Sequence, residues 1–202
     1  SWINKLPTRP LGFGHGGIAP ASGVGVELRG AFNLGSSVFN YSFYSTNGPT
    51  IKTPSGKEPE ESGMLSFGTL ADNNTAKSFG GRIGILPFSN GSTELGFSFY
   101  STDKVGDIGT EYENLGANLY ALDFSFVKQI PSLGGTFDIK AQYNNSKVDN
   151  IVYHIEEEDD HGDEDVVDEH KGVAERFLEV EEFDFDNQSS SYYVRLAYRP
   201  TM

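Results

Sequence analysis

Hydrophobic and polar residues alternate with a period of two in seven segments of the chain. In residues 136–146, for example, Phe137, Ile139 and Tyr143 alternate with polar residues such as Asp138 and Lys140. The seven segments are residues 22–34, 37–46, 78–88, 94–101, 117–128, 136–146 and 190–199. Because successive side chains point to opposite faces of a strand, each segment predicts a β-strand with one apolar and one polar face.

The connections between these segments alternate between short and long. The short ones, rich in residues that favour turns, span residues 34–37, 89–93 and 130–135. The long ones span residues 47–77, 102–116 and 147–189. In an up-and-down meander every second connection lies at the same end of the sheet, so the short turns should gather at one end and the long loops at the other. Short periplasmic turns and long extracellular loops are typical of outer-membrane barrels.

We therefore predict an all-β fold, an antiparallel up-and-down transmembrane β-barrel that spans residues 1–202 as one segment. Residues 47–77 and 147–189 would be long extracellular loops, and residues 1–21, rich in Pro and Gly, an irregular extracellular loop. Seven strands is an odd number, whereas bacterial single-chain barrels have even numbers. We interpret the chain as a mature form or a fragment, and expect further strands on both sides in a barrel of about 14–18 strands.

A soluble β-sandwich is the alternative interpretation, since its strands also alternate. The strands expected here run for 8–13 residues, above the usual soluble length of roughly 5–6 residues. The chain has no run of about 18 apolar residues and so predicts no transmembrane helix. The asymmetry of the loops has no rationale in a soluble sandwich, and the barrel is the favoured interpretation.

The composition fits a sheet with one hydrophobic and one hydrophilic face, because aromatic residues reach 13% while hydrophobic residues make up only 37%. The formal net charge of −14 comes almost entirely from one segment of the chain. Residues 149–186 hold 17 Asp and Glu against Lys171 and Arg176, so the rest of the chain is close to neutral. No basic patch is present to meet phosphates, which argues against a nucleic-acid partner. The absence of Cys excludes disulfides.

The polar faces of the predicted strands carry candidate pore-lining charges. Charges that line a channel set its ion preference by pairing with or repelling the permeant ion. The alternative is that opposite charges pair across neighbouring strands, stabilise the barrel wall and have no effect on permeant ions. The candidates are Glu27, Arg29, Arg82, Asp123, Asp138, Lys140, Arg195 and Arg199.

The acidic loop holds candidate metal ligands, because histidines and carboxylates alternate within it. Such groups could bind Zn²⁺, or the carboxylates alone could bind Ca²⁺. The alternative is a solvated, self-repelling charge run, and the spacing matches no EF-hand pattern. The candidate ligands are His154, Asp160, His161, Asp163 and His170.

Enzymatic motifs are absent from the sequence. No G-x-S-x-G, H-E-x-x-H or P-loop pattern occurs, and all four histidines fall in expected loops. We therefore expect no enzymatic activity.

Several short segments together resemble bacterial outer-membrane porins, and among these the phosphate-selective type. They are residues 11–17 (LGFGHGG), 25–30 (GVELRG), 47–49 (NGP), 81–84 (GRIG), 122–126 (LDFSF) and 194–200 (VRLAYRP). The resemblance implies a protein of the bacterial outer membrane, surrounded by its lipid, that lets small solutes diffuse passively and often forms trimers. It includes no arginine ladder and implies no particular solute.

Two functions therefore stand as expectations. The first is a porin for passive diffusion of small polar or ionic solutes. The second is a surface receptor or an outer-membrane assembly component, in which the barrel is an anchor and the acidic loop binds a divalent metal or a partner.

Overall fold

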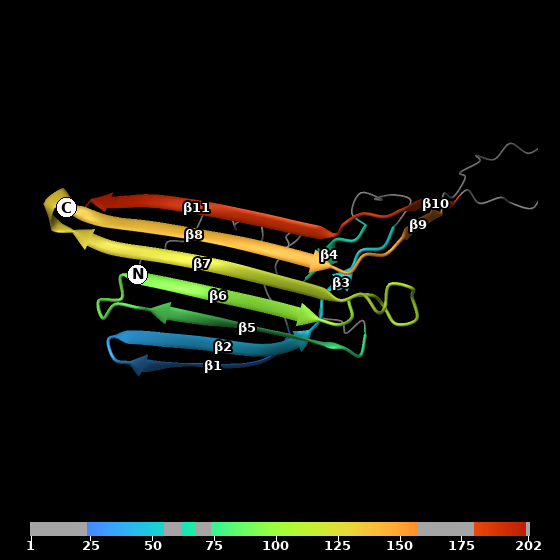
Figure 1. Cartoon of the computed structure of the whole chain (residues 1–202), viewed down its shortest axis with the longest axis horizontal. Coiled ribbons are helices and arrows are strands. Elements are labelled where there is room, and N and C mark those ends of the chain that lie inside the picture. Colours follow the sequence, from blue (N-terminus) through green and yellow to red (C-terminus); the bar gives the residue numbers. More distant parts are fainter. Residues whose placement is uncertain (1–23, 55–61, 68–73, 157–179, 201–202) are drawn as a thin grey trace, which may run out of the picture.

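A computed structural model of the chain describes residues 24–54, 62–67, 74–156 and 180–200. These residues form one seven-stranded antiparallel sheet in the order β1-β2-β5-β6-β7-β8-β11, a simple up-and-down meander (Figure 1). The all-β prediction is confirmed, and each of the seven predicted strands is present. Their bounds are β1 Gly25–Leu34, β2 Ser37–Asn47, β5 Lys77–Leu86, β6 Thr93–Thr102, β7 Ala117–Ile130, β8 Gly135–Val148 and β11 Gln188–Pro200.

The short turns gather at one end of the sheet and the long connections at the other, as the meander requires (Figure 1). All three short turns depend on a glycine with positive φ, since Gly35 and Gly91 both have a φ of +61° and Gly134 has a φ of +59°. Gly35 occupies the first central position of the two-residue β1–β2 turn, which is the glycine position of a type II′ hairpin. The third short turn contains a single 3-10 turn, η2 (Pro131–Leu133).

The long connections contain two small sheets that the sequence analysis did not predict. β3 (Thr50–Ile51) pairs with β4 (Leu65–Ser66), and β9 (Tyr153–Glu156) pairs with β10 (Val180–Phe183). Figure 1 shows both at the loop end of the main sheet. Strands of two or four residues are too short for an alternating pattern to identify, which explains why the sequence indicated only loops.

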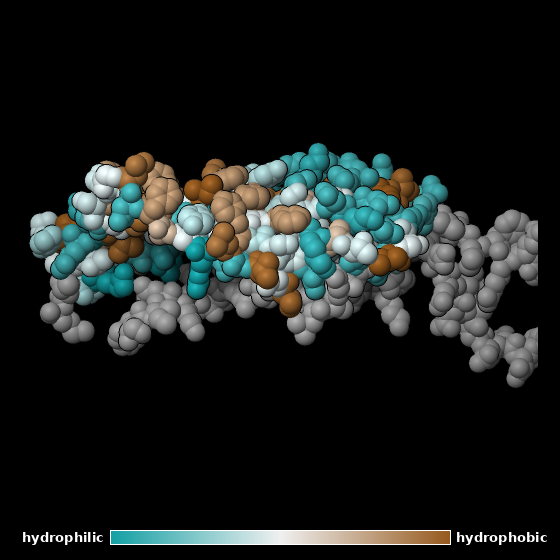
Figure 2. Space-filling view, turned by 90° about the horizontal axis from the view of Figure 1, so that it is seen from below, coloured by the Kyte–Doolittle hydropathy of each residue, from teal (hydrophilic) through white to brown (hydrophobic). Residues whose placement is uncertain are grey.

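The strand register places most of the hydrophobic residues of all seven strands on one side, here named the apolar face. One row of directly opposed residues runs across six strands through Phe39, Ile85, Leu95, Phe124, Ala141 and Val194. Within the described residues no second sheet covers this face, and Leu122, Val194 and Leu196 keep 58%, 66% and 72% of their surface exposed. Figure 2 shows hydrophobic side chains gathered toward the short turns and the middle, and hydrophilic ones toward the loop end.

The buried core lies at the loop end, on the opposite side of the sheet, here named the polar face. We name this cluster the loop cap. Its four members from the main sheet are Tyr100, Ala117, Leu119 and Val148, which all point to the polar face in the register. Its members from the long connections are Ile51, Leu65, Val105, Tyr112, Leu115 and Tyr153. The long connections therefore fold over one end of the polar face.

The sheet does not close on itself. Among the described residues β1 pairs with β2 alone, and β11 pairs with β8 alone. Both outer edges thus present a row of unpaired backbone groups, which is a template for pairing with a further strand. No helix within the described residues is long and apolar enough to cross a membrane.

Candidate functional site

The polar face carries every charged residue that the sequence analysis proposed for a pore lining. The register places all of them on the side opposite the apolar face, spread over five of the seven strands. Most of them gather into two clusters. The residues so placed are Glu27, Arg29, Arg82, Asp123, Asp138, Lys140, Arg195 and Arg199.

Arg82 is the centre of the first cluster. Its Nη2 and Nε donate to the two carboxylate oxygens of Asp123, at 2.7 and 3.2 Å. Nη2 also donates to Oε1 of Glu94 at 3.0 Å, and Nη1 donates to Oδ1 of Asn40 at 3.0 Å. These four residues come from four adjacent strands and are named the Arg82 cluster. One guanidinium faces two carboxylates, so the formal net charge of the cluster is −1.

Asp138 is the centre of the second cluster, at the short-turn side of β8 and β11. Its side chain is only 2% exposed, and its Oδ2 lies 2.8 Å from Nη2 of Arg195 and 3.6 Å from Nη2 of Arg199. Lys140 stands directly opposite Arg195 on the same face. We name these four residues the Asp138 cluster. The cluster contains three cations and one carboxylate, so its formal net charge is +2.

Pairing across strands thus accounts for Arg82, Asp123, Asp138, Arg195 and, at longer distance, Arg199. Within the described residues the remaining three candidates, Glu27, Arg29 and Lys140, make no ion pair.

The sequence analysis missed Glu94 and Asn40. Both occupy polar positions in alternating segments, so the alternation was a sufficient signal for their face. Their contact with Arg82 follows only from the register.

Backbone and side-chain contacts tie the three long connections together in the loop cap. Ile51 N donates to Val105 O at 2.8 Å, and Asn74 Nδ2 donates to Gly106 O at 3.2 Å, which joins the first connection to the second. Asn187 Nδ2 donates to Gly63 O at 2.8 Å, which joins the first to the third. The connections at this end therefore form one packed unit rather than three separate loops.

Aromatic rings join the second and third connections of the loop cap. The ring of Tyr153 stacks between Tyr112 and Phe185, with centroids 5.5 and 5.3 Å apart. Burial of the Tyr112 side chain, followed by its interaction with the Glu111 carboxylate, raises the pKa of Tyr112 to about 12. Tyr112 is therefore protonated throughout the neutral range.

The predicted metal ligands lie mostly outside the described residues. Asp160, His161, Asp163 and His170 belong to that part of the chain. His154 lies in β9, with Nε2 3.7 Å from Oε2 of Glu111 and Nδ1 3.6 Å from Oε1 of Glu182. Across the part of the chain that the structure describes, no group of three or more His, Asp or Glu has metal-binding geometry. The metal site in the acidic loop stays a prediction.

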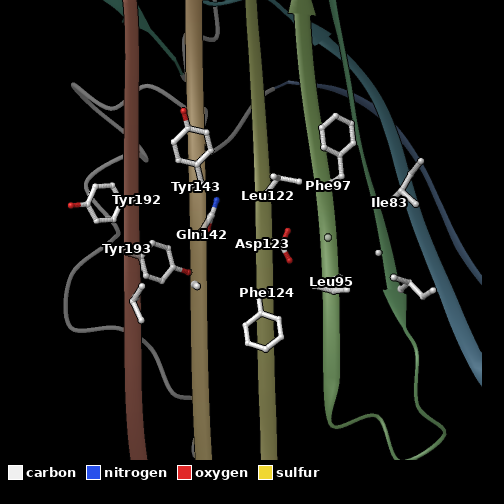
Figure 3. Close-up of a pocket in the computed structure, with 15 residues that line it drawn as sticks. Ile83, Leu95, Phe97, Leu122, Asp123, Phe124, Gln142, Tyr143, Tyr192 and Tyr193 are labelled. Atoms are coloured by element: carbon white, nitrogen blue, oxygen red, sulfur yellow. The ribbon is translucent and has the colours of Figure 1, made fainter.

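The apolar face carries a shallow hollow near its centre (Figure 3). Large side chains from successive strands surround it, among them Phe97, Leu122, Tyr143 and Tyr192, which lie side by side in the close-up. Ala141 contributes only a methyl group in the row between Phe124 and Val194, which deepens the surface there. The lining of the hollow is almost wholly apolar.

Comparisons of the chain with protein-family models, with curated proteins and with solved structures find no match.

The first prediction concerns the buried carboxylate of Asp138. Replacing Asp138 with Ala should lower the free energy of unfolding by about 3 kcal/mol, because a buried charge loses its partner when one member of a pair is removed. Glu27→Ala is the matched control, since Glu27 is an exposed carboxylate on the same face. Urea unfolding of the chain refolded in detergent micelles measures both. Equal losses in the two variants would show that the buried pair does not stabilise the sheet.

The second prediction concerns Tyr112 and alkaline pH. The folded pKa of about 12 exceeds the ordinary tyrosine value of 10.0, so the neutral hydroxyl stabilises the loop cap fully below pH 10. This contribution should be lost as the pH rises from about 10 to about 12. The difference in tyrosinate absorbance between the parent and Tyr112→Phe should have its midpoint near pH 12. In urea-unfolded protein the midpoint should fall near 10, and a midpoint near 10 in both states would contradict the burial of the hydroxyl.

Proposed function

We propose that the chain forms part of the wall of a bacterial outer-membrane porin, a barrel through which small polar or ionic solutes diffuse passively. The observation that carries this proposal is the division of one long-stranded sheet into an uncovered apolar face and a charged polar face. A soluble sheet with this division needs a second layer over its apolar side. Lipid supplies that layer in a membrane barrel, and water fills the other side.

The lengths and side chains of the strands support the membrane assignment. The seven strands have 10–14 residues, and a tilted membrane-spanning strand needs about 9–11. On β11 the apolar face reads Tyr192, Val194, Leu196 and Tyr198, with aromatic rings at both ends of an aliphatic stretch. Aromatic girdles at the two interfaces and an apolar band between them are typical of such barrels.

The polar face has the features of a channel wall. The Arg82 cluster, centred on β5–β7, has a net charge of −1 and the Asp138 cluster on β8 and β11 has a net charge of +2. Charges of opposite sign on neighbouring parts of one wall produce a field across the lumen, which acts on ions that pass. The loop cap covers the same face at its loop end, so in a barrel it would narrow the mouth.

The open edges of the sheet support closure with other strands. The outer backbone groups of β1 (10 residues) and β11 (13 residues) have no strand partner among the described residues. Inside a membrane every backbone N–H and C=O must be satisfied, and a closed barrel achieves this. We infer that further strands complete the wall. The resemblance to porins implies that the complete barrels assemble as trimers.

The third prediction tests whether the apolar face meets lipid. Leu122→Arg places a charge at the centre of that face and should destabilise the protein in lipid vesicles by about 2–4 kcal/mol. Ala121→Arg is the matched control, because Ala121 is its neighbour on β7 but lies on the polar face. Unfolding in urea from vesicles measures both. If Ala121→Arg costs more than Leu122→Arg, the polar face rather than the apolar face meets lipid.

The fourth prediction tests the channel itself. The full-length protein that contains this chain should produce discrete conductance steps in planar bilayers bathed in KCl, because charged, hydrated walls line the proposed lumen. Recordings with and without Zn²⁺ or Ca²⁺ test the alternative function. Saturable metal binding by a protein that forms no channel would support a surface receptor and overturn the porin proposal.

A further inference from the structure

Two glycines face each other on the polar face at the position of the Arg82 cluster. Asn40, Gly84, Gly96 and Asp123 are directly opposed in register across β2, β5, β6 and β7. The two central positions of this row have no side chain. Because neighbouring strands lie about 4.8 Å apart, roughly 14 Å separate the backbones of the outer two residues. We name the gap above Gly84 and Gly96 the glycine slot.

The guanidinium of Arg82 fills the glycine slot. Arg82 stands two residues before Gly84 on the same strand and face, and its two Nη atoms reach Asn40 and Asp123 on either side of the slot, at 3.0 and 2.7 Å. A Cβ at position 84 would lie 2.7 Å from Nη1 of Arg82. A Cβ at position 96 would lie 2.4 Å from both Nη2 of Arg82 and Oδ1 of Asp123. A side chain at either position would therefore force the guanidinium, or the Asn40 or Asp123 group that it contacts, to shift.

The slot determines where the positive charge of Arg82 lies. Held close to the backbone of β5 and β6, the guanidinium donates to both carboxylates of the cluster and to the Asn40 amide. An arginine with neither a slot nor a carboxylate beside it has nothing to hold its guanidinium against the sheet. Arg29 on β1 is an example, since it is exposed and has no ion pair among the described residues.

We propose that Gly84 and Gly96 are positioning residues that set the ion preference of the proposed channel. By holding Arg82 against the wall, they present permeating ions with a cluster of net charge −1 and not with an extended cation. Small cations are the ions that such a patch favours. This inference rests on the proposed porin function, and its test has one readout that needs no conductance.

The first readout is the chemical reactivity of Arg82. Phenylglyoxal modifies accessible guanidinium groups, and peptide mass mapping reports the rate at each arginine. In the refolded parent Arg82 should react several-fold more slowly than Arg29, and in Gly96→Ala it should react as fast as Arg29. Gly84→Ala is a second variant, because the atoms nearest to its Cβ are the far ends of the Asn40 and Arg82 side chains. Equal rates for Arg82 and Arg29 in the parent would overturn the proposal.

Gly80→Ala is the matched control for both readouts. Gly80 lies on the same strand and face as Arg82, but the atoms nearest to a Cβ there belong to the ring and hydroxyl of Tyr44. This variant makes the same change from glycine to alanine inside a strand and leaves the slot intact. It should leave the reactivity of Arg82 unchanged, and an increase equal to that of Gly96→Ala would show that the slot has no specific role.

The second readout is the reversal potential of the full-length protein in planar bilayers under a KCl gradient. The ratio of K⁺ to Cl⁻ permeability should fall several-fold in Gly96→Ala and stay at the parent value in Gly80→Ala. In an Arg82→Gln background, adding Gly96→Ala should change nothing further, because the cation that it releases is gone. A Gly96→Ala channel with the parent's selectivity overturns this inference alone. A parent without conductance overturns the porin proposal, and the ion preference with it.

Discussion

The uncovered apolar face is the constraint on which the rest of the structure depends. Seven strands of 10–14 residues direct alternate side chains to one side, and residues such as Leu122 and Leu196 remain more than half exposed there. A soluble monomer rarely exposes a contiguous apolar surface of this extent. Whatever covers that face determines which medium fills the other side, and therefore what the charges of the polar face can do.

On the polar face the constraint is the cost of placing charges close to the backbone, and pairing charges within the sheet lowers that cost. The guanidinium of Arg82 bridges carboxylates of two neighbouring strands, and Asp138 is buried beneath two arginines of β11. Pairing of this kind lowers the cost of charges close to the backbone, where a single unpaired ion would be expensive. The Arg82 cluster keeps an excess of negative charge and the Asp138 cluster an excess of positive charge. The two parts of the polar face therefore differ in net charge. In the proposed channel, ion pairs that stabilise the sheet and a field that acts on solutes would thus be two consequences of one arrangement.

The strands and their faces could be predicted because a period of two is a local property of the sequence. Phe97 and Phe99, for example, belong to one face whatever their neighbours are. The Arg82 cluster could not be predicted, because Glu94, Asn40 and Gly96 reach Arg82 only through the register of four strands. The loop cap could not be predicted for a similar reason. Val105 and Tyr153 do not belong to an alternating segment, and they are buried by distant parts of the chain. Four of the five predicted metal ligands lie outside the described residues, so that prediction is open.

The position of the buried core is a further argument about the environment of the sheet. Every buried apolar residue of the loop cap lies at the loop end and on the polar side. The middle of the sheet is therefore held by backbone ladders and ion pairs, with no packed layer on its apolar side among the described residues. Burial of apolar surface is the dominant favourable term in folding, and here most of that surface becomes buried only when an outside medium covers it. A bilayer would supply the missing burial along the whole length of the strands, whereas the loop cap could hold only one end.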